Sequence, residues 1–250
     1  MGFGWQFDSV SRYSPGFLAS GQGNDQYTKI LLHMDGANGG TTFTDSNLGG
    51  SAHTWTAHSA TTVTSGPKFG TASCQCPYID TPDSSDFTLG SGDWTIDFWF
   101  NPNATINPAN AAARMAGQTN STGTIATTSA YVVLASIGSG NYVLELVVSN
   151  GTTLFTLLGT TAFTSASSGW HHAELCRSGN NLKLFLDGVQ EGGDLAITGT
   201  VVDSSNNFSV GRIGEVTSQT FAGLIDEFRL SVGIARHTAN FTPPTAPYGP

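Results

Sequence analysis

The sequence predicts an all-β protein folded as a two-sheet antiparallel sandwich of the jelly-roll type. Only 11% of the 250 residues are charged, whereas surface helices usually carry many Glu and Lys side chains. Short apolar or alternating segments recur along the chain and are separated by glycine-rich turn signals. Sandwiches of this length commonly form a single domain, so we expect one principal domain.

The predicted strands follow one another closely, which favours an antiparallel meander over crossover helices. Residues 29–35, KILLHMD, predict a strand with an apolar centre that ends in an Asp-Gly turn. Residues 93–102 alternate, with Trp94, Ile96, Phe98 and Phe100 on one face. Two longer segments, 131–151 and 170–189, each contain two strands joined by a turn, at 138–141 and 178–181. Segments 207–214 and 223–232 complete the series.

Two further segments are assigned to other structures. Residues Asn107–Gly117 predict about two helical turns after Pro108, with Gly117 as the stop signal. The end of the chain from Phe241 is too rich in proline for a central strand. Phe241 and Tyr248 are candidates for tying this end to the domain surface.

The first 26 residues form a predicted N-terminal docking or oligomerisation arm, and residues 27–250 form the domain. The arm is rich in Gly and Ser and has neither strand nor helix periodicity. Disordered tails are normally poor in aromatic residues, but this arm contains Phe3, Trp5, Phe7, Tyr13 and Phe17. These residues either pack on the chain's own domain or dock on a neighbouring subunit.

Charge and hydropathy exclude several partners. The formal net charge is −9, and the nine Lys and Arg residues are spread singly along the chain. No basic stripe exists for nucleic acid, and no apolar run is long enough to span a membrane. The start of the chain lacks the features of a secretory signal, and Gln6 does not fit a myristoylation motif. We therefore expect the protein to be synthesised in a cytoplasm.

The three cysteines, Cys74, Cys76 and Cys176, are too few and too scattered for a disulfide framework. Cys74 and Cys76 alone make a poor zinc site. We predict that all three are buried free thiols.

The segment GLIDEFRL, residues 223–230, places a carboxylate within an apolar strand face. In a regular strand Leu224, Asp226, Phe228 and Leu230 share one side. A buried carboxylate needs hydrogen-bond donors, a cation or a proton. Asp226 could therefore be a catalytic acid, a metal ligand or a structural carboxylate, and the lack of a catalytic companion favours the structural role.

Several motifs occur in order between about Ile30 and Tyr248: LLHMDGANGGTTFTDS, KFGTAS, SGDWTIDFWFNP, GWHHAEL, LKLFLDGV and FAGLIDEFRLSVGIARHTANFTPPTAPY. Together they resemble the laminin-G-like, concanavalin A-like jelly-roll domains found in virion and tail proteins of tailed bacteriophages and in marine viral sequences. The resemblance implies the jelly-roll fold. This fold carries lectins, glycosidases, adhesins and scaffolds alike.

The resemblance also implies sites against which the residues can be compared. Laminarinase-type glucanases carry Glu-x-Asp-x-Glu on one strand, which supplies the acid/base and the nucleophile. This motif is missing here, and the five glutamates are far apart: Glu145, Glu174, Glu191, Glu215 and Glu227. Nucleophile elbows and phosphate loops are also missing, and a packing role is favoured for His171 and His172. We therefore expect a non-enzymatic protein.

Pentraxin-like and laminin-G relatives often bind calcium at a loop rim. No segment of this chain supplies several oxygen ligands at close spacing. We predict no cofactor, and calcium is the alternative. The residues to inspect are Asp35 and Asp226 first, and then Asp45, Asp187, Asp194 and Asp203.

Three functions are compatible with the predicted fold and the missing catalytic motifs. The first is a bacteriophage virion structural protein, located in the virion as a capsid decoration, head fibre or tail component. It would dock through its arm on other virion proteins and self-associate. The second is an adhesin for a host surface polysaccharide, with Trp55, His58, Trp99 and Tyr142 as candidate stacking platforms. Packing of each of these residues against the second layer or a loop is the equal alternative. The third is a secreted lectin-like or glycosidase-accessory module, disfavoured by the missing signal and linker.

Overall fold

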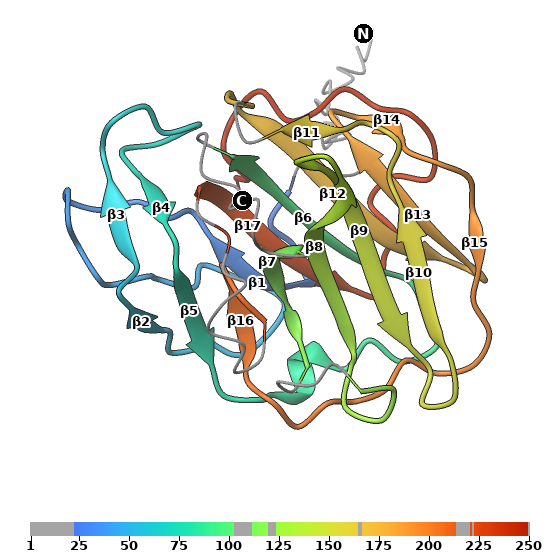
Figure 1. Ribbon diagram of the computed structural model, residues 1–250. Helices are drawn as coiled ribbons and strands as arrows, with labels where there is room; N and C mark the ends of the chain where they lie inside the picture. Colours follow the sequence, from blue (N-terminus) through green and yellow to red (C-terminus); the bar gives the residue numbers. More distant parts are fainter. Residues whose placement is uncertain are drawn as a thin grey trace, which may run out of the picture.

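The computed structural model describes residues 23–102, 112–119, 124–164, 167–213, 221 and 223–249. These residues form two antiparallel β-sheets that pack against each other (Figure 1). The predicted all-β, two-sheet sandwich is thus confirmed. Among the described residues, no helix is long and apolar enough to cross a membrane.

The first sheet has nine strands. They are β1 (Thr28–Leu32), β3 (Thr61–Val63), β4 (Ser73–Gln75), β6 (Trp94–Asn101), β12 (His171–Ser178), β13 (Asn181–Leu186), β14 (Val189–Gln190), β15 (Leu195–Ala196) and β17 (Leu224–Val232). Their order is β14-β13-β12-β6-β17-β4-β3, with β1 added beside β17 and β15 beside β13. β6 and β17 therefore lie at the centre of this sheet.

The second sheet has eight strands. They are β2 (Thr56–His58), β5 (Tyr78–Thr81), β7 (Ala112–Gln118), β8 (Ala130–Gly138), β9 (Asn141–Ser149), β10 (Leu154–Leu158), β11 (Phe163–Thr164) and β16 (Phe208–Val210). Their order is β10-β9-β8-β7-β16-β5-β2, and β11 also pairs with β9. A short 3-10 helix, η1 (Ser85–Phe87), follows β5.

The main core lies between the sheets. From β6 it takes Trp94, Ile96, Phe98 and Phe100, the four residues predicted to share a face. From β8 and β9 it takes Val132, Leu134, Leu144, Leu146 and Val148. Burial of each large apolar side chain stabilises the fold by roughly 1.5–3 kcal/mol. The alternating side chains of β8 and β9 face away from the first sheet.

The predicted hairpins are confirmed at both turns. Ser139 and Gly140, between β8 and β9, have φ of 54° and 73°, the left-handed pair that a two-residue hairpin turn uses. Gly179, between β12 and β13, has a φ of 58°. The turn residues thus place β8 beside β9 and β12 beside β13.

The predicted helix at 107–117 is wrong for its described part. Residues 112–118 form β7, which pairs with β8 and with β16. Intrinsic helix propensity is a weak preference that tertiary pairing overrides. The small residues suit a central strand, because a side chain at Gly117 would collide with the Ala130 carbonyl and Tyr131.

The chain after β17 folds back over the outer side of the first sheet. The Phe241 ring contacts the rings of His172 and Phe185, and Tyr248 is buried, as proposed for these two aromatic residues. At the same corner the amide of Asn24 donates to the carbonyl of Gly249 at 2.7 Å. The aromatic residues of the predicted arm, Phe3, Trp5, Phe7, Tyr13 and Phe17, lie outside the described residues.

All three cysteines are buried and free of disulfide bonds, as predicted. Burial raises the pKa of the Cys74 and Cys176 thiols above the usual value. These thiols therefore behave as apolar packing groups at neutral pH.

Candidate ligand-binding site

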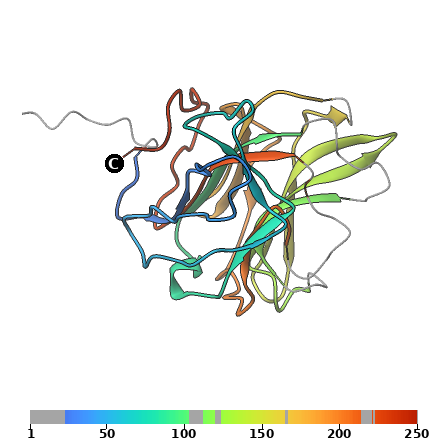
Figure 2. The ribbon, with the colours of Figure 1, turned by 90° about the vertical axis from the view of Figure 1, so that its left-hand side faces the viewer.

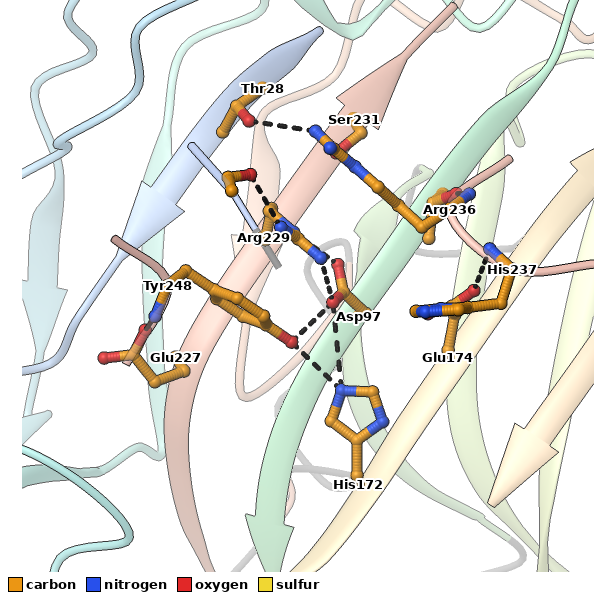
Figure 3. A network of polar contacts seen from close by, with 12 residues as sticks. Thr28, Asp97, His172, Glu174, Glu227, Arg229, Ser231, Arg236, His237 and Tyr248 are labelled. Carbon is orange, nitrogen blue, oxygen red and sulfur yellow. Dashed lines mark hydrogen bonds and ion pairs between the residues drawn. The ribbon is translucent and has the colours of Figure 1, made fainter. Parts of the chain in front are cut away.

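A buried polar network occupies the outer side of the first sheet (Figure 3). Arg229 of β17 donates from Nε to Asp97 Oδ1 at 2.9 Å and from Nη2 to Asp97 Oδ2 at 2.7 Å. The Tyr248 hydroxyl donates to Asp97 Oδ2 at 2.5 Å and lies 3.0 Å from His172 Nε2. All four side chains are buried, so the network closes the chain end onto the sheet and is inaccessible to a ligand.

The charges of this network stabilise one another. Burial alone would raise the pKa of Asp97, but the charge and hydrogen bonds of Arg229, together with His172, hold it well below its usual value. Desolvation would lower the pKa of Arg229, and Asp97 raises it above its usual value. Asp97 and Arg229 thus remain an ionised pair, with the paired geometry that buried charges require.

Further carboxylates hold the same chain end. Glu174 accepts hydrogen bonds from the His237 amide at 3.0 Å and from its Nδ1 at 2.7 Å. Asp25 forms a two-bond ion pair with Arg236 at 2.7 and 2.8 Å. Glu174 lies opposite Asp97 in the strand register, but both carboxylates are fully buried and engaged. This close pair gives no support to a glycosidase mechanism, which needs carboxyl groups that reach the substrate.

Asp226 is fully buried and accepts backbone hydrogen bonds from two segments. Its Oδ2 accepts from the amides of Lys68 at 2.9 Å and Phe69 at 3.2 Å, and its Oδ1 accepts from the amide of Glu227 at 2.9 Å. Burial raises the pKa of Asp226 to about 8, against the lowering effect of these amides. The geometry is that of a carboxylate that fastens the 68–69 loop to β17.

The face assigned to Asp226 from the sequence is wrong. A register irregularity against β6 follows Asp226, and Glu227 has a φ of 48°. This bulge inserts one residue and interrupts the regular alternation. Asp226 therefore pairs with Trp99 on the outer side, whereas Phe228 and Leu230 lie in the core.

The acids considered for calcium are engaged with protein groups in separate parts of the structure. Asp35 accepts hydrogen bonds from Thr71 and Ala72. The others pair as Asp45 with His53, Asp187 with His171, Asp194 with Lys183, and Asp203 with Thr88. Within the described ranges, no group of three His, Cys, Asp or Glu side chains is arranged to hold a metal ion.

The rings proposed as sugar platforms are mostly inaccessible. Trp55, Trp99 and Tyr142 are 7%, 5% and 0% exposed, respectively. Lys68 covers Trp99, with its Nζ 3.7 Å from the ring centroid. For these three rings the structure shows packing, the alternative to an open platform. His58 is half-exposed and stacks on Tyr78 at a centroid distance of 4.0 Å.

The outer face of the second sheet, the side turned away from the first sheet, carries a different set of residues. Arg114 of β7 and Glu145 of β9 both pair with Val133 of β8, so the three form one row. The strands β7, β8 and β9 are neighbours in the second sheet (Figure 1). Tyr131 lies two residues along β8, with its ring centroid 5.9 Å from the Arg114 guanidinium carbon. Arg114, Tyr131 and Glu145 are half-buried.

An apolar patch adjoins these polar groups. Val133, Ala135 and Ile213 form a small cluster separate from the main core, and Tyr131 packs against it. The outer face thus carries an aromatic ring and two opposite charges beside a buried apolar cluster. This combination is typical of sites that bind small polar ligands.

The ionisable groups of this face are partly desolvated. Burial raises the pKa of the Glu145 carboxyl, and Arg114 opposes this effect. Burial also lowers the pKa of Arg114 and raises that of Tyr131. Partly desolvated charges outside the core are candidates for ligand recognition. We define Arg114, Tyr131 and Glu145 as the outer-face triad.

A stacked group lies on the same outer face at β5. Tyr78 and Asp80 flank the core residue Ile79 and so point outward. The Tyr78 ring lies between His58 and Arg212, whose guanidinium carbon is 3.4 Å from the ring centroid. Asp80 Oδ1 lies within hydrogen-bond distance of His58 Nε2, at 3.0 Å. Tyr78 is therefore held rigidly, with both faces covered.

Sequence reasoning missed the outer-face triad. Arg114 lies within the predicted helix at 107–117, and Tyr131 is the first residue of the segment 131–151 predicted to form two strands. Glu145 carried the available signal, because it is the one charged residue in the apolar segment 141–149. A charged residue that alternates with core leucines marks a solvent-side position in a strand.

Comparison with known proteins identifies the fold. Residues 75–233 match the family model Laminin_G_3, described as concanavalin A-like lectin/glucanases superfamily. No curated protein sequence matches the chain.

Solved structures show the same architecture at low sequence identity. Domain 4 of AbnA, a GH43 extracellular arabinanase from Geobacillus stearothermophilus in complex with arabinotriose, has a TM-score of 0.57 and 16% identity. The alignment covers 84% of this chain and 94% of that one. The ligand binding domain of Botulinum neurotoxin serotype D, in complex with N-acetylneuraminic acid, has a TM-score of 0.57 and 11% identity, with 84% and 49% covered.

A third similar structure is the binding domain of Paraclostridial Mosquitocidal Protein 1, with a TM-score of 0.56 and 14% identity. The alignment covers 84% of this chain and 50% of that chain. The protein thus spans about half the length of these two toxin binding domains.

Proposed function

The chain belongs to the concanavalin A-like lectin/glucanases superfamily, and on this premise we propose that it is a non-catalytic, lectin-like module that binds carbohydrate. The binding site is the outer face of the second sheet, centred on the outer-face triad. The observation that carries the proposal is the position of Tyr131 on the middle one of three adjacent strands, two residues from the row in which Arg114 and Glu145 flank Val133. Function on this fold has to be argued from such a site, because the fold itself serves many functions.

Each member of the triad has a role in this proposal. The half-exposed Tyr131 ring offers an apolar surface on which a sugar ring stacks, and its hydroxyl offers a hydrogen bond. Arg114 donates to sugar oxygens, and Glu145 accepts from sugar hydroxyls. The strand backbone holds the three side chains at fixed positions, which lowers the entropy cost of binding.

The related structures support the class of ligand. The arabinanase domain is in complex with arabinotriose, and the neurotoxin domain is in complex with N-acetylneuraminic acid. Both ligands are saccharides bound by proteins that contain this fold. A non-catalytic role is supported by the engagement of Asp97 and Glu174 in buried hydrogen bonds.

A glycan array tests this proposal. Wild-type protein should bind a restricted set of glycans, and Tyr131→Ala should weaken that binding about tenfold or more, because truncation of a central aromatic contact commonly costs about 2 kcal/mol. Tyr27→Ala is the matched control, since Tyr27 is also half-buried but packs against Gly233 on the first sheet. Equal binding by wild type and Tyr131→Ala would contradict the assignment of the site.

We propose a bacteriophage virion role as the setting in which such a module acts. The support is the sequence resemblance and one feature of the fold. Gly23 pairs with Gly249, and Figure 2 shows this chain end on the side opposite the β8–β9 hairpin. An anchor attached at Gly23 would leave the outer face of the second sheet free for ligand. Immunogold labelling of purified particles tests this role.

A further inference from the structure

Arg212 is a buried cation on the outer face of the second sheet. It lies two residues after the end of β16, is 8% exposed, and has its guanidinium carbon 3.4 Å from the Tyr78 ring centroid. Gly211, with a φ of 90°, turns the chain so that Arg212 reaches the outer side. The neighbouring Ile213 belongs to the apolar cluster that also contacts Tyr131.

No acid neutralises Arg212 in the part of the chain that the structure describes. Its guanidinium makes no hydrogen bond or ion pair there, and its Nε is buried without a partner. The nearby Asp80 is engaged by His58 and Asn207. A buried cation without a partner is costly unless something else supplies the negative charge.

The other described arginines have protein partners. Arg229 pairs with Asp97 and Arg236 with Asp25, as described above, and Arg177 donates to the carbonyls of Gly179 and Gly199. In a chain with 18 acidic residues and nine basic ones, an unpaired buried arginine is therefore unusual. The stacked Tyr78 holds the guanidinium plane in place without using its hydrogen-bond donors.

Arg212 lies next to the outer-face triad. The Phe221 amide donates to the carbonyls of both Arg114 and Gly211, at 3.1 and 2.8 Å, so the backbones that carry the two arginines adjoin. Gly211 also donates to the carbonyl of Met115. The Arg212 guanidinium lies over Tyr78 of β5, beyond β16 from Arg114, so a saccharide of several units that runs from Tyr131 across β7 and β16 would meet both arginines.

We propose that the outer face binds a carboxylate-bearing saccharide, with Arg212 as the residue that receives the carboxylate. This inference rests on the proposed carbohydrate-binding function and names its ligand class. A guanidinium presents parallel N–H donors that match the two oxygens of a carboxylate. Uronic acids and sialic acids share this chemistry. Arg114 is already opposed by Glu145, so among the described residues of this face Arg212 supplies the positive charge that no acid opposes.

Titration calorimetry with paired ligands tests the inference. The acidic probes are trigalacturonate and sialyllactose, and their neutral counterparts are the methyl ester of trigalacturonate and lactose. Wild type should bind at least one acidic probe about tenfold more tightly than its neutral counterpart, the effect of one charge-assisted hydrogen-bonded pair. Arg212→Gln should abolish this difference, and Arg212→Lys should retain part of it.

Lys183→Gln is the matched control. It removes one positive charge, as Arg212→Gln does, but Lys183 is paired with Asp194 on the first sheet. Binding should be unchanged in this variant. A melting curve for each protein shows that it is folded, and Arg212→Lys keeps the test informative where Arg212→Gln does not fold.

The outcomes separate the inference from the proposed function. Equal affinity for acidic and neutral probes, or equal effects of Arg212→Gln and Lys183→Gln, would overturn the inference while leaving carbohydrate binding in place. If neither acidic probe binds but neutral glycans bind on the array, the inference is also overturned while carbohydrate binding stands. Failure of every glycan on the array to bind would overturn the proposed function as well.

Discussion

Arg229 and Asp97 form a bidentate ion pair between the two central strands of the first sheet, and both side chains are fully buried. The sequence-remote Tyr248 hydroxyl completes the hydrogen bonding of Asp97. Because the pair lies beneath the chain end that follows β17, its function is to join this end to the sheet.

Removal of one partner of this pair should be strongly destabilising. Arg229→Met would leave the Asp97 carboxylate buried without its counter-charge, and we expect a loss of about 3–5 kcal/mol in the free energy of unfolding. Urea denaturation provides the measurement. Lys183→Gln, which breaks a partly exposed ion pair, should cost no more than about 1 kcal/mol. Similar losses for the two variants would contradict this role.

Tyr248→Phe should loosen the chain end. The variant lacks the hydroxyl that donates to Asp97 and contacts His172, and it leaves both buried groups short of a partner. We expect a loss of about 1–3 kcal/mol and faster proteolysis after residue 232. Tyr27→Phe is the control, because Tyr27 is half-buried outside this network. Unchanged proteolysis would argue that the network does not hold the chain end.

Stability should fall as pH rises from about 4 to 8. The pKa of Asp226 is about 8 in the folded protein and about 3.9 in an unfolded chain. The folded state therefore holds an extra proton in this window, and its stabilising effect is lost as pH approaches 8. His33 acts in the same direction, because its hydrogen bond with Glu227 raises its pKa.

Melting temperatures of wild type and Asp226→Asn across this pH range check the prediction. The neutral amide cannot ionise, and its oxygen still accepts from Lys68 and Phe69. The melting temperature of wild type should decrease from pH 5 to pH 8, and that of the variant should vary less. Parallel curves would show that Asp226 does not titrate in this window.

Gly117→Ala distinguishes the strand from the helix predicted for this segment. In a helix the substitution would stabilise by about 1 kcal/mol. In β7, Gly117 has a φ of 145° and a Cβ would collide with Ala130 and Tyr131, so we expect a loss larger than 1 kcal/mol. Gly92→Ala is the control, because a Cβ there meets no atom within 4 Å. Unfolding in urea measures both variants.

The elements predicted correctly are those in which local pattern and tertiary packing agree. The alternation of Trp94 to Phe100 and the glycine turns at 138–141 and 178–181 each specify a strand or a hairpin without reference to distant residues. The helix predicted at 107–117 is wrong over its described residues, 112–117, because the alanines there favour a helix in isolation. Pairing with β8 and β16 decides the structure of this segment, and those contacts come from distant parts of the chain.

The candidate site was less predictable than the fold. The prediction that Asp226 shares a face with Phe228 and Leu230 is wrong, because the alternation of apolar residues does not reveal the bulge at Glu227. Trp55, Trp99 and Tyr142 are aromatic, but burial removes them as platforms. The stacking of Arg212 on Tyr78 joins segments more than 100 residues apart, and no local pattern signals such a contact.

Carbohydrate binding by the outer face of the second sheet is open to a direct test. An amide NMR titration of the protein with arabinotriose, sialyllactose and trigalacturonate in turn tests it most directly. We predict that at least one ligand shifts amide signals of β7, β8 and β9 and of Arg212 and Ile213. Shifts centred on the first sheet, around Lys68 and Trp99, or no shifts with any of the three ligands at millimolar concentration, would contradict carbohydrate binding at this face.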